Sequence, residues 1–324
     1  MIEKQKALVD RIHKAGGEVL MSSHVLKYIP SERVLPESRR YTDYTDNLVI
    51  GKDLYTIKEG HVDSPSLIRI DSTGKEHFVS SFAHVASAPK WDKASGRLYW
   101  SEGIPDERWT LKSDSKIRFM EEGKRARRTF RNKEMLYNPV YGQNGIASIR
   151  YKSDGHSSLE MMDGANGKIT ESFPAPDSLQ LVEAAWIGDK VYVTAISENG
   201  YGIYSLSNGC WKSVLGPQPV MIKDFQAWND EIMLTCDRTG VNELYHLDPA
   251  TGELRQKTVT RYGASDFSYD DEGKYLYYSS QTVKGMKIFR TAVEDLVDRK
   301  ADFSEKHRWV LAEKLAGQEN AIAR

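Results

Sequence analysis

The stretch AAWIGDKVYVTAISENGYGIYSLSNGCW, residues 184–211, contains two short runs of strand-forming residues, and each run ends in a turn. Val, Ile, Tyr and Thr dominate VYVTAIS and YGIYSL, and these residue types favour strands. Gly, Asn and Asp fill the positions between the runs, where they suit tight turns. The stretch therefore predicts short antiparallel strands joined by tight turns.

The same pattern occurs six times along the chain, and such a repeat is the signature of a modular fold. Each copy starts near an apolar or aromatic residue, passes through a polar turn, and continues into three or four strand formers. One apolar residue marks the same place in every copy, at spacings of 44, 49, 44, 41 and 44 residues. These marker residues are Leu54, Leu98, Ala147, Val191, Ile232 and Leu276.

A second short apolar strand follows each marker, so one copy amounts to about four antiparallel strands. A lone sheet of this size cannot bury both faces, whereas copies stacked radially around an axis bury one another. The sequence thus predicts an all-β fold, a six-bladed β-propeller over residues 36–296. A β-sandwich and a seven-bladed ring are the alternatives. Residues 39–44, RRYTDY, are expected to supply a strand that closes the ring by pairing with the last blade.

The two ends of the chain follow other patterns. Residues 1–35 predict a short helix–strand segment, because an amphipathic stretch over 3–14 is followed by Gly-Gly and by EVLMSSH at 18–24. Residues 297–324 predict a C-terminal helical tail, which is either a solvated helix or a connector to another domain. Its apolar stripe has helical spacing and comprises Trp309, Ala312, Leu315 and Ala316.

Composition narrows the function classes. The 324 residues include 45 Lys plus Arg and 46 Asp plus Glu, without the basic excess typical of nucleic-acid binders. No apolar run approaches the roughly 18 residues of a membrane span. Cys210 and Cys236 are expected to be buried free thiols, and the spacing of His and Cys indicates neither a metal site nor a cofactor.

The charged start MIEKQK is unlike a signal peptide, so the chain as written is expected in the cytoplasm. If Met1 is not the native start, the chain is expected in the periplasm or cell envelope.

Over residues 44–296 the copies resemble the TolB/tricorn-type propeller repeat. Segment 138–163 follows that repeat through Asn138, Pro139, Gly145, Asp154, Gly155 and Asp163, and segment 236–254 through Asp237, Arg238, Gly240, Leu244, Tyr245 and Asp248. The resemblance implies a protein-interaction platform or a filter beside a hydrolase. The chain also resembles propeller segments of large bacterial cell-envelope proteins.

Residues 2–35 resemble a fragment of type I 3-dehydroquinate dehydratase. Met21, Ser22, Ser23 and His24 match the stretch that carries that family's catalytic histidine. The resemblance implies a proton-transfer role for His24, beside a Schiff-base lysine on the following barrel strand. That lysine has no counterpart here, because Lys52 and Lys58 fall in an expected propeller strand. The stretch is therefore interpreted as a remnant, and His24 is catalytic only if the segment is active.

The propeller sequence contains no GxSxG and no HExxH, so no catalytic residue is assigned within it. Asp237 and Arg238 are weak candidates for ligand binding at the ring mouth, the alternative being a structural ion pair. His246 is interpreted as a residue on a strand face. Trp91, Trp186 and Trp228 recur at equivalent positions, which favours packing between blades over an aromatic binding platform.

These observations favour a non-enzymatic platform that binds a protein partner or a small ligand at one propeller face, as part of a larger cell-envelope protein or alone. Two alternatives stay open. One is a lyase resembling 3-dehydroquinate dehydratase, acting through the N-terminal segment, and the other is the accessory propeller of a peptidase.

Overall fold

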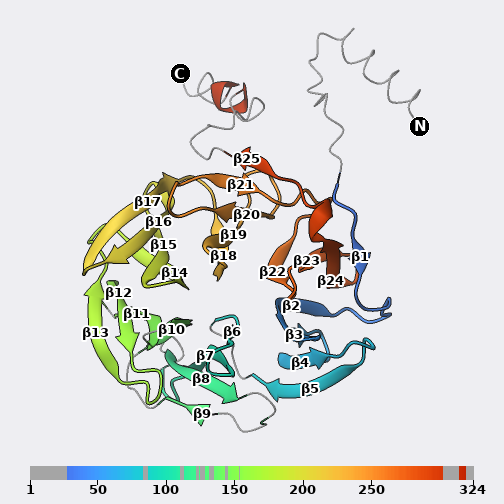
Figure 1. The fold of residues 1–324 in the computed structure, drawn as a ribbon, viewed down its shortest axis with the longest axis horizontal. Helices are drawn as coiled ribbons and strands as arrows, with labels where there is room; N and C mark the ends of the chain where they lie inside the picture. Colours follow the sequence, from blue (N-terminus) through green and yellow to red (C-terminus); the bar gives the residue numbers. More distant parts are fainter. Residues whose placement is uncertain are drawn as a thin grey trace.

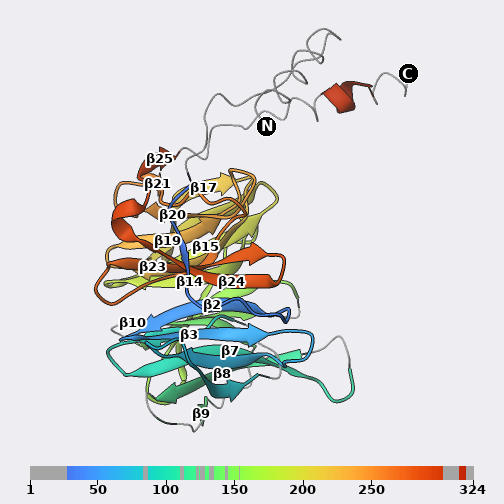
Figure 2. The same ribbon diagram turned by 90° about the vertical axis from the view of Figure 1, so that its right-hand side faces the viewer.

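Six antiparallel sheets surround a central axis as the blades of a propeller (Figure 1). The computed structural model describes residues 28–82, 87–109, 113–121, 124, 128–130, 135–142, 145–152, 154–301 and 314–318. In blades one to five the first strand in the sequence lies nearest the axis and the last lies at the rim, whereas blade six has β22 innermost and β1, from the start of the chain, at its rim. Figure 2 shows the ring from its side, with β2, β3, β7 and β8 of the first two blades toward the viewer.

Blades one to three follow one another along the chain. Blade one consists of β2 (Asp43–Ile50), β3 (Asp53–Glu59), β4 (Ser66–Ile70) and β5 (Glu76–Ser81). Blade two consists of β6 (Lys90–Asp92), β7 (Arg97–Pro105), β8 (Ser113–Glu121) and β9 (Arg128–Thr129). Blade three consists of β10 (Leu136–Gly142), β11 (Gly145–Tyr151), β12 (Ser157–Met162) and β13 (Ile169–Pro174).

Blades four to six complete the ring. Blade four consists of β14 (Gln180–Ile187), β15 (Lys190–Ser197), β16 (Gly200–Ser207) and β17 (Cys210–Gln218). Blade five consists of β18 (Ile222–Trp228), β19 (Glu231–Cys236), β20 (Glu243–Leu247), β21 (Leu254–Gln256) and β25 (Arg299–Ala301). Blade six consists of β22 (Ser265–Tyr269), β23 (Tyr275–Thr282), β24 (Gly285–Ala292) and β1 (Glu32–Arg33).

The predicted six-bladed propeller is confirmed. All six marker residues lie buried in the second strand of their blade, in β3, β7, β11, β15, β19 and β23. Neighbouring blades bury one another's faces, as the stacked rings of Tyr99 in blade two and Tyr141 in blade three show, with centroids 4.4 Å apart. Such aromatic pairs stabilise by about 0.5–1.5 kcal/mol beyond the area that they bury.

The ring closes through the two-residue strand β1, which pairs antiparallel with β24 at the rim of blade six. The expected closing segment 39–44 lies elsewhere, because β2 begins at Asp43 and forms the innermost strand of blade one. At the other end, β25 pairs with β21 and widens blade five. The ring therefore uses strands on both sides of the expected span 36–296.

The rest of the chain beyond the ring is described in part. A short helix at 314–318 lies within the expected helical tail. Residues 1–27, and with them most of the dehydratase-like stretch, lie outside the described residues.

The two cysteines differ in their surroundings. Cys236 is buried, as expected, and burial raises the pKa of its thiol to about 12. Cys210 is exposed, so the prediction that it is buried was wrong. Within the described residues, no helix combines the length and apolar character needed to cross a membrane.

Candidate functional site

Five of the six innermost strands break their pairing register close to the propeller axis, each through a β-bulge. In four of them the bulge holds an Asp or Asn in the left-handed region, a conformation that these two residue types tolerate better than most. These residues are Asp46 (φ 53°), Asn138 (φ 49°), Asp224 (φ 52°) and Asp266 (φ 56°). The bulges therefore place acidic and amide side chains around the axis at matching points of the ring.

A buried hydroxyl takes a matching place on the second strand of each blade, and in five blades it lies beside the bulge. In blade five, Thr235 donates a 2.7 Å hydrogen bond to the Asp224 carboxylate, and in blade three Ser148 donates a 2.7 Å bond to the Tyr137 carbonyl. Because buried polar groups need partners, the hydroxyls satisfy groups that the bulges leave unpaired. The six residues are Thr56, Ser101, Ser148, Thr194, Thr235 and Ser279.

The bulges surround a cavity of about 240 Å³ on the axis, which we call the acidic chamber. Asp46, Glu183 and Asp224 line it, and Lys90 is the basic side chain in the described part of its wall. Asp266 lies beside it, since its backbone N–H donates to the Asp224 carboxylate over 3.1 Å. Three lining carboxylates thus face one ammonium group.

Burial and nearby negative charge raise the pKa of three of these carboxyl groups, those of Asp46, Glu183 and Asp266. Burial, with the charge of Asp224 added, raises the pKa of Asp46 to about 6 and that of Asp266 to about 8. Burial also raises the pKa of Glu183, while the nearby Lys90 acts in the opposite direction. The chamber therefore favours either a bound proton or another positive charge.

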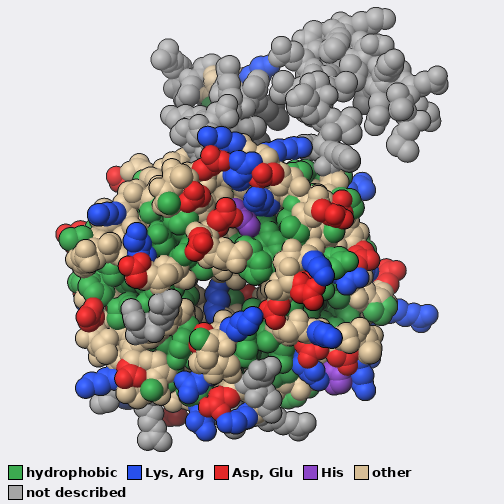
Figure 3. All heavy atoms as spheres, in the orientation of Figure 1, with side chains coloured by type: hydrophobic (Ala, Val, Ile, Leu, Met, Phe, Trp, Pro, Cys, Tyr) green, Lys and Arg blue, Asp and Glu red, His purple; other side chains and the backbone are tan. Residues whose placement is uncertain are grey.

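Next to the chamber lies a second hollow of about 250 Å³, the aromatic mouth, and the two spaces together form what we call the central channel. Lys90 and Ala184 line both spaces, so the mouth and the chamber meet. Figure 3 shows an opening at the centre of the ring. Six aromatic side chains define the aromatic mouth: Trp91, Tyr99, Tyr141, Trp186, Trp228 and Tyr269.

Tyr99 comes from β7, and the other five aromatic residues come from the innermost strands, near their ends. Trp91 and Trp186 take matching places, opposite Leu98 and Val191 on the next strand, but Trp228 lies one position further along, since Ala227 faces Ile232. The expected equivalence therefore holds for two of the three tryptophans. Trp186 is buried and Trp91 and Trp228 are half-buried, and all three line the mouth.

A buried histidine, His246, contacts Tyr269, one of the residues that line the mouth. His246 lies in β20, as the strand-face interpretation predicts, with its Nδ1 2.7 Å from a Glu231 carboxylate oxygen. Its Nε2 lies 3.2 Å from the Tyr269 hydroxyl, and burial lowers the pKa of the imidazole. Tyr269 in turn stacks on Trp228 with centroids 4.5 Å apart. This chain of contacts fixes the orientation of two mouth residues.

The residues singled out from the sequence lie elsewhere. Asp237 and Arg238 follow β19 at the face of the ring opposite the mouth, where the exposed Asp237 carboxylate accepts the Met221 backbone N–H over 3.0 Å. Their role in ligand binding stays a prediction, and His24 lies outside the described residues. In the described part of the chain, no three His, Cys, Asp or Glu side chains are placed to hold a metal ion.

Sequence reasoning missed the acidic chamber. A signal was present, because an Asp-Phe pair recurs at 224–225 and 266–267, 42 residues apart, at the start of two innermost strands. Its meaning depends on the left-handed bulge, which no spacing rule predicts.

Comparison with known proteins supports the fold of this chain and does not assign it a function. No family model matches the chain, and no curated protein matches it in sequence. Among solved structures, the β-propeller domain of the Trilobed protease from Pyrococcus furiosus is 11% identical, with a TM-score of 0.54 over 82% of this chain and 100% of that one. That domain has an open velcro topology, whereas β1 pairs with β24 here.

Two further structures are similar. A putative TolB from Agrobacterium tumefaciens is 12% identical, with a TM-score of 0.55 over 70% of this chain and 84% of that one. Pyrococcus horikoshii acylaminoacyl peptidase is 11% identical, with a TM-score of 0.53 over 82% of this chain and 53% of that one, so the chain spans about half of that peptidase. None of these matches supports the resemblance of residues 2–35 to a dehydratase.

Proposed function

We propose that this propeller is a non-enzymatic binding platform whose ligand enters the central channel by the aromatic mouth and places a positively charged group in the acidic chamber. The observation that supports it is the junction of an aromatic hollow with a cavity lined by three carboxylates and one lysine. Aromatic faces attract apolar groups and cations, and carboxylates select cations over anions. An ammonium or guanidinium group on an apolar body, such as a peptide N-terminus, matches both spaces.

The surroundings of three residues, Ser87, His246 and Cys236, support a role without catalysis. Ser87, the lining hydroxyl of the chamber, takes part in a 2.7 Å hydrogen bond with Ser101. His246 is held by Glu231 and Tyr269, and a nucleophilic mechanism needs its base beside a Ser or Cys. Cys236 is buried with a raised pKa, which opposes formation of the reactive thiolate.

The accessory propeller of a peptidase is a second candidate. The similarity in fold to an acylaminoacyl peptidase favours it, although that similarity is one of architecture. In this case the channel would admit peptide chains to a hydrolase on another domain. A hydrolase encoded with this chain, and copurifying with it, is the expected finding.

The test of the main proposal is a calorimetric titration of the whole chain with phenylalanine amide, whose free ammonium group is absent from the matched ligand N-acetylphenylalanine amide. We expect the charged ligand to bind at least about tenfold more tightly, the size of one charge-assisted hydrogen bond. Glu183→Gln should remove most of this preference. Glu171→Gln, an exposed site on β13, should leave it unchanged. Equal binding of the two amides would refute the proposal.

A further inference from the structure

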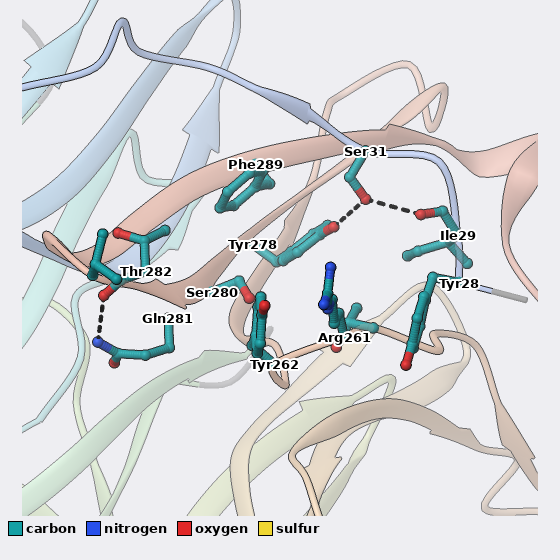
Figure 4. A pocket seen from close by; sticks show the side chains of 12 residues that line it. Tyr28, Ile29, Ser31, Arg261, Tyr262, Tyr278, Ser280, Gln281, Thr282 and Phe289 are labelled. Carbon is teal, nitrogen blue, oxygen red and sulfur yellow. Dashed lines mark hydrogen bonds between the residues drawn. The ribbon is translucent and has the colours of Figure 1, made fainter. Parts of the chain in front are cut away.

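A separate pocket lies at the seam where the ring closes, and it has a volume of about 730 Å³ (Figure 4). Its walls come from residues 28–31, which precede β1, from the connection 260–262 between β21 and β22, and from the β23–β24 hairpin. β22 ends at the aromatic mouth with Tyr269 and β23 runs back, so this hairpin turns at the opposite face. We call this space the seam pocket, and its volume is typical of small-molecule sites.

The seam pocket presents apolar surface to solvent. At its rim, Tyr28 is 45% exposed, Tyr262 61% and Val283 93%. Below them, Ile29 and Tyr278 are buried and form the floor. Large exposed apolar side chains gathered around a hollow mark binding sites, whereas single ones are ordinary.

The serine and threonine hydroxyl groups in these walls, and the hydroxyl of Tyr278, are already engaged within the protein. Ser31 shares a hydrogen bond with Tyr278, and Ser280 donates to the Gly263 carbonyl over 2.6 Å. Thr282 donates to the Gly285 carbonyl over 2.7 Å, and Thr260 donates to the Glu243 carboxylate over 3.0 Å. A ligand therefore meets a largely apolar wall with few unused hydroxyl groups.

Arg261 is the exception. It is the charged residue of the lining, and it forms no ion pair or hydrogen bond with any residue in the described part of the chain. Its guanidinium carbon lies 5.2 Å from the centre of the Tyr262 ring. Figure 4 shows the Arg261 side chain between Tyr28 and Tyr262, with its end directed toward Tyr278. Its donors are thus available at the centre of an apolar space.

We propose that the seam pocket binds an apolar monocarboxylate. The apolar body lies against Tyr28, Tyr262 and Val283, and the carboxylate accepts paired hydrogen bonds from the guanidinium group of Arg261. Guanidinium and carboxylate match geometrically in this two-point arrangement, which makes it one of the stronger polar contacts. Because residues 28–31 form one wall and lead into the closing strand, the bound ligand also stabilises the closed ring.

The test compares three ligands with one apolar body: 4-phenylbutyrate, 4-phenylbutanol and 4-phenylbutylamine, each titrated calorimetrically into the whole chain. We expect the carboxylate to bind about 10–100-fold more tightly than the alcohol or the amine, as loss of a charge-assisted contact implies. Only the carboxylate should raise the melting temperature measurably.

Three variants of the pocket and one control variant test which residues produce the preference for the carboxylate. Arg261→Gln should abolish the preference for the carboxylate, and Arg261→Lys should keep part of it. Tyr262→Ala should weaken all three ligands to a similar degree. Arg299→Gln, on the exposed start of β25, is the matched control and should bind as the wild type does.

Equal affinity for the three ligands, an unchanged preference in Arg261→Gln, or no binding of 4-phenylbutyrate at millimolar concentration would each overturn the proposal. Its failure is distinguishable from failure of the channel proposal, because the two sites are tested with ligands of opposite charge.

Discussion

The backbone N–H of Phe225 in blade five donates a 2.6 Å hydrogen bond to the carboxylate of Glu183 in blade four. A similar link joins blade three to blade four, where the Asn138 amide donates to the Val182 carbonyl over 2.6 Å. Asn47 of blade one reaches the Asp266 carbonyl of blade six over 3.1 Å. Side chains at the axis therefore connect neighbouring blades, and two of them, Asn138 and Glu183, also line the acidic chamber.

This link predicts a difference between two substitutions at Glu183. Both Glu183→Gln and Glu183→Ala remove the charge, but only alanine removes the acceptor of the buried Phe225 N–H. We expect the alanine variant to be less stable than the glutamine variant by about 1–3 kcal/mol, the cost of an unsatisfied buried donor. Urea unfolding measures it. The same pair of changes at the exposed Glu171 should differ by less than about 0.5 kcal/mol.

The carboxyl groups of Asp46 and Asp266 should make a contribution to stability that is lost as the pH rises from about 4 to 8. The folded chain holds protons on Asp46, with its pKa raised to about 6, and on Asp266, with its pKa raised to about 8, whereas unfolded Asp titrates near 3.9. The native state thus binds more protons in this range, and the free energy of unfolding decreases by up to about 1.4 kcal/mol per pH unit for each extra proton.

The variant Asp266→Asn should flatten this dependence, because asparagine tolerates the left-handed backbone and does not titrate. Urea midpoints measured between pH 5 and pH 8 give the comparison. The same pH dependence in the wild type and in Asp266→Asn would contradict the account of the chamber.

Gly142 controls the position of a mouth residue. A Cβ atom at Gly142 would lie 2.0 Å from the Trp186 ring, so Gly142→Ala must displace the indole. We expect a loss of stability of about 1–3 kcal/mol, as for overpacked cores, and weaker binding of phenylalanine amide. Gly216→Ala is the control, since open space surrounds that position. Unfolding and titration of both variants measure the effect, and equal behaviour of the two would show that Trp186 does not depend on this contact.

The closing strand depends on a tether next to it. The buried Thr291 hydroxyl donates a 2.6 Å hydrogen bond to the Pro30 carbonyl, just before β1. Thr291→Val keeps the shape and removes the donor, so we expect a loss of about 1 kcal/mol. The exposed Thr170→Val should change stability by less than about half of that amount, as read from urea midpoints. A Thr291→Val chain as stable as the wild type would show that the tether contributes little.

The sequence predicted the blades because each marker residue, such as Val191 or Ile232, must be buried in a short strand between turns. It did not predict the closing strand, since Glu32 and Arg33 carry no apolar pattern, and the ion pair of Glu32 with Arg290 opposite it forms only when the two ends of the ring meet. Nor did it predict the channel, because Asp46 and Asp224 are far apart in the chain and meet only when the ring closes.

The most direct test of the central claim is a crystal of the whole chain soaked with 4-bromophenylalanine amide, in which anomalous scattering locates the bromine atom. The account predicts bromine in the aromatic mouth, beside Trp91 and Trp228, with the ammonium group directed toward Asp224. Bromine only on the outer surface of the blades, or an empty channel at saturating ligand, would contradict it.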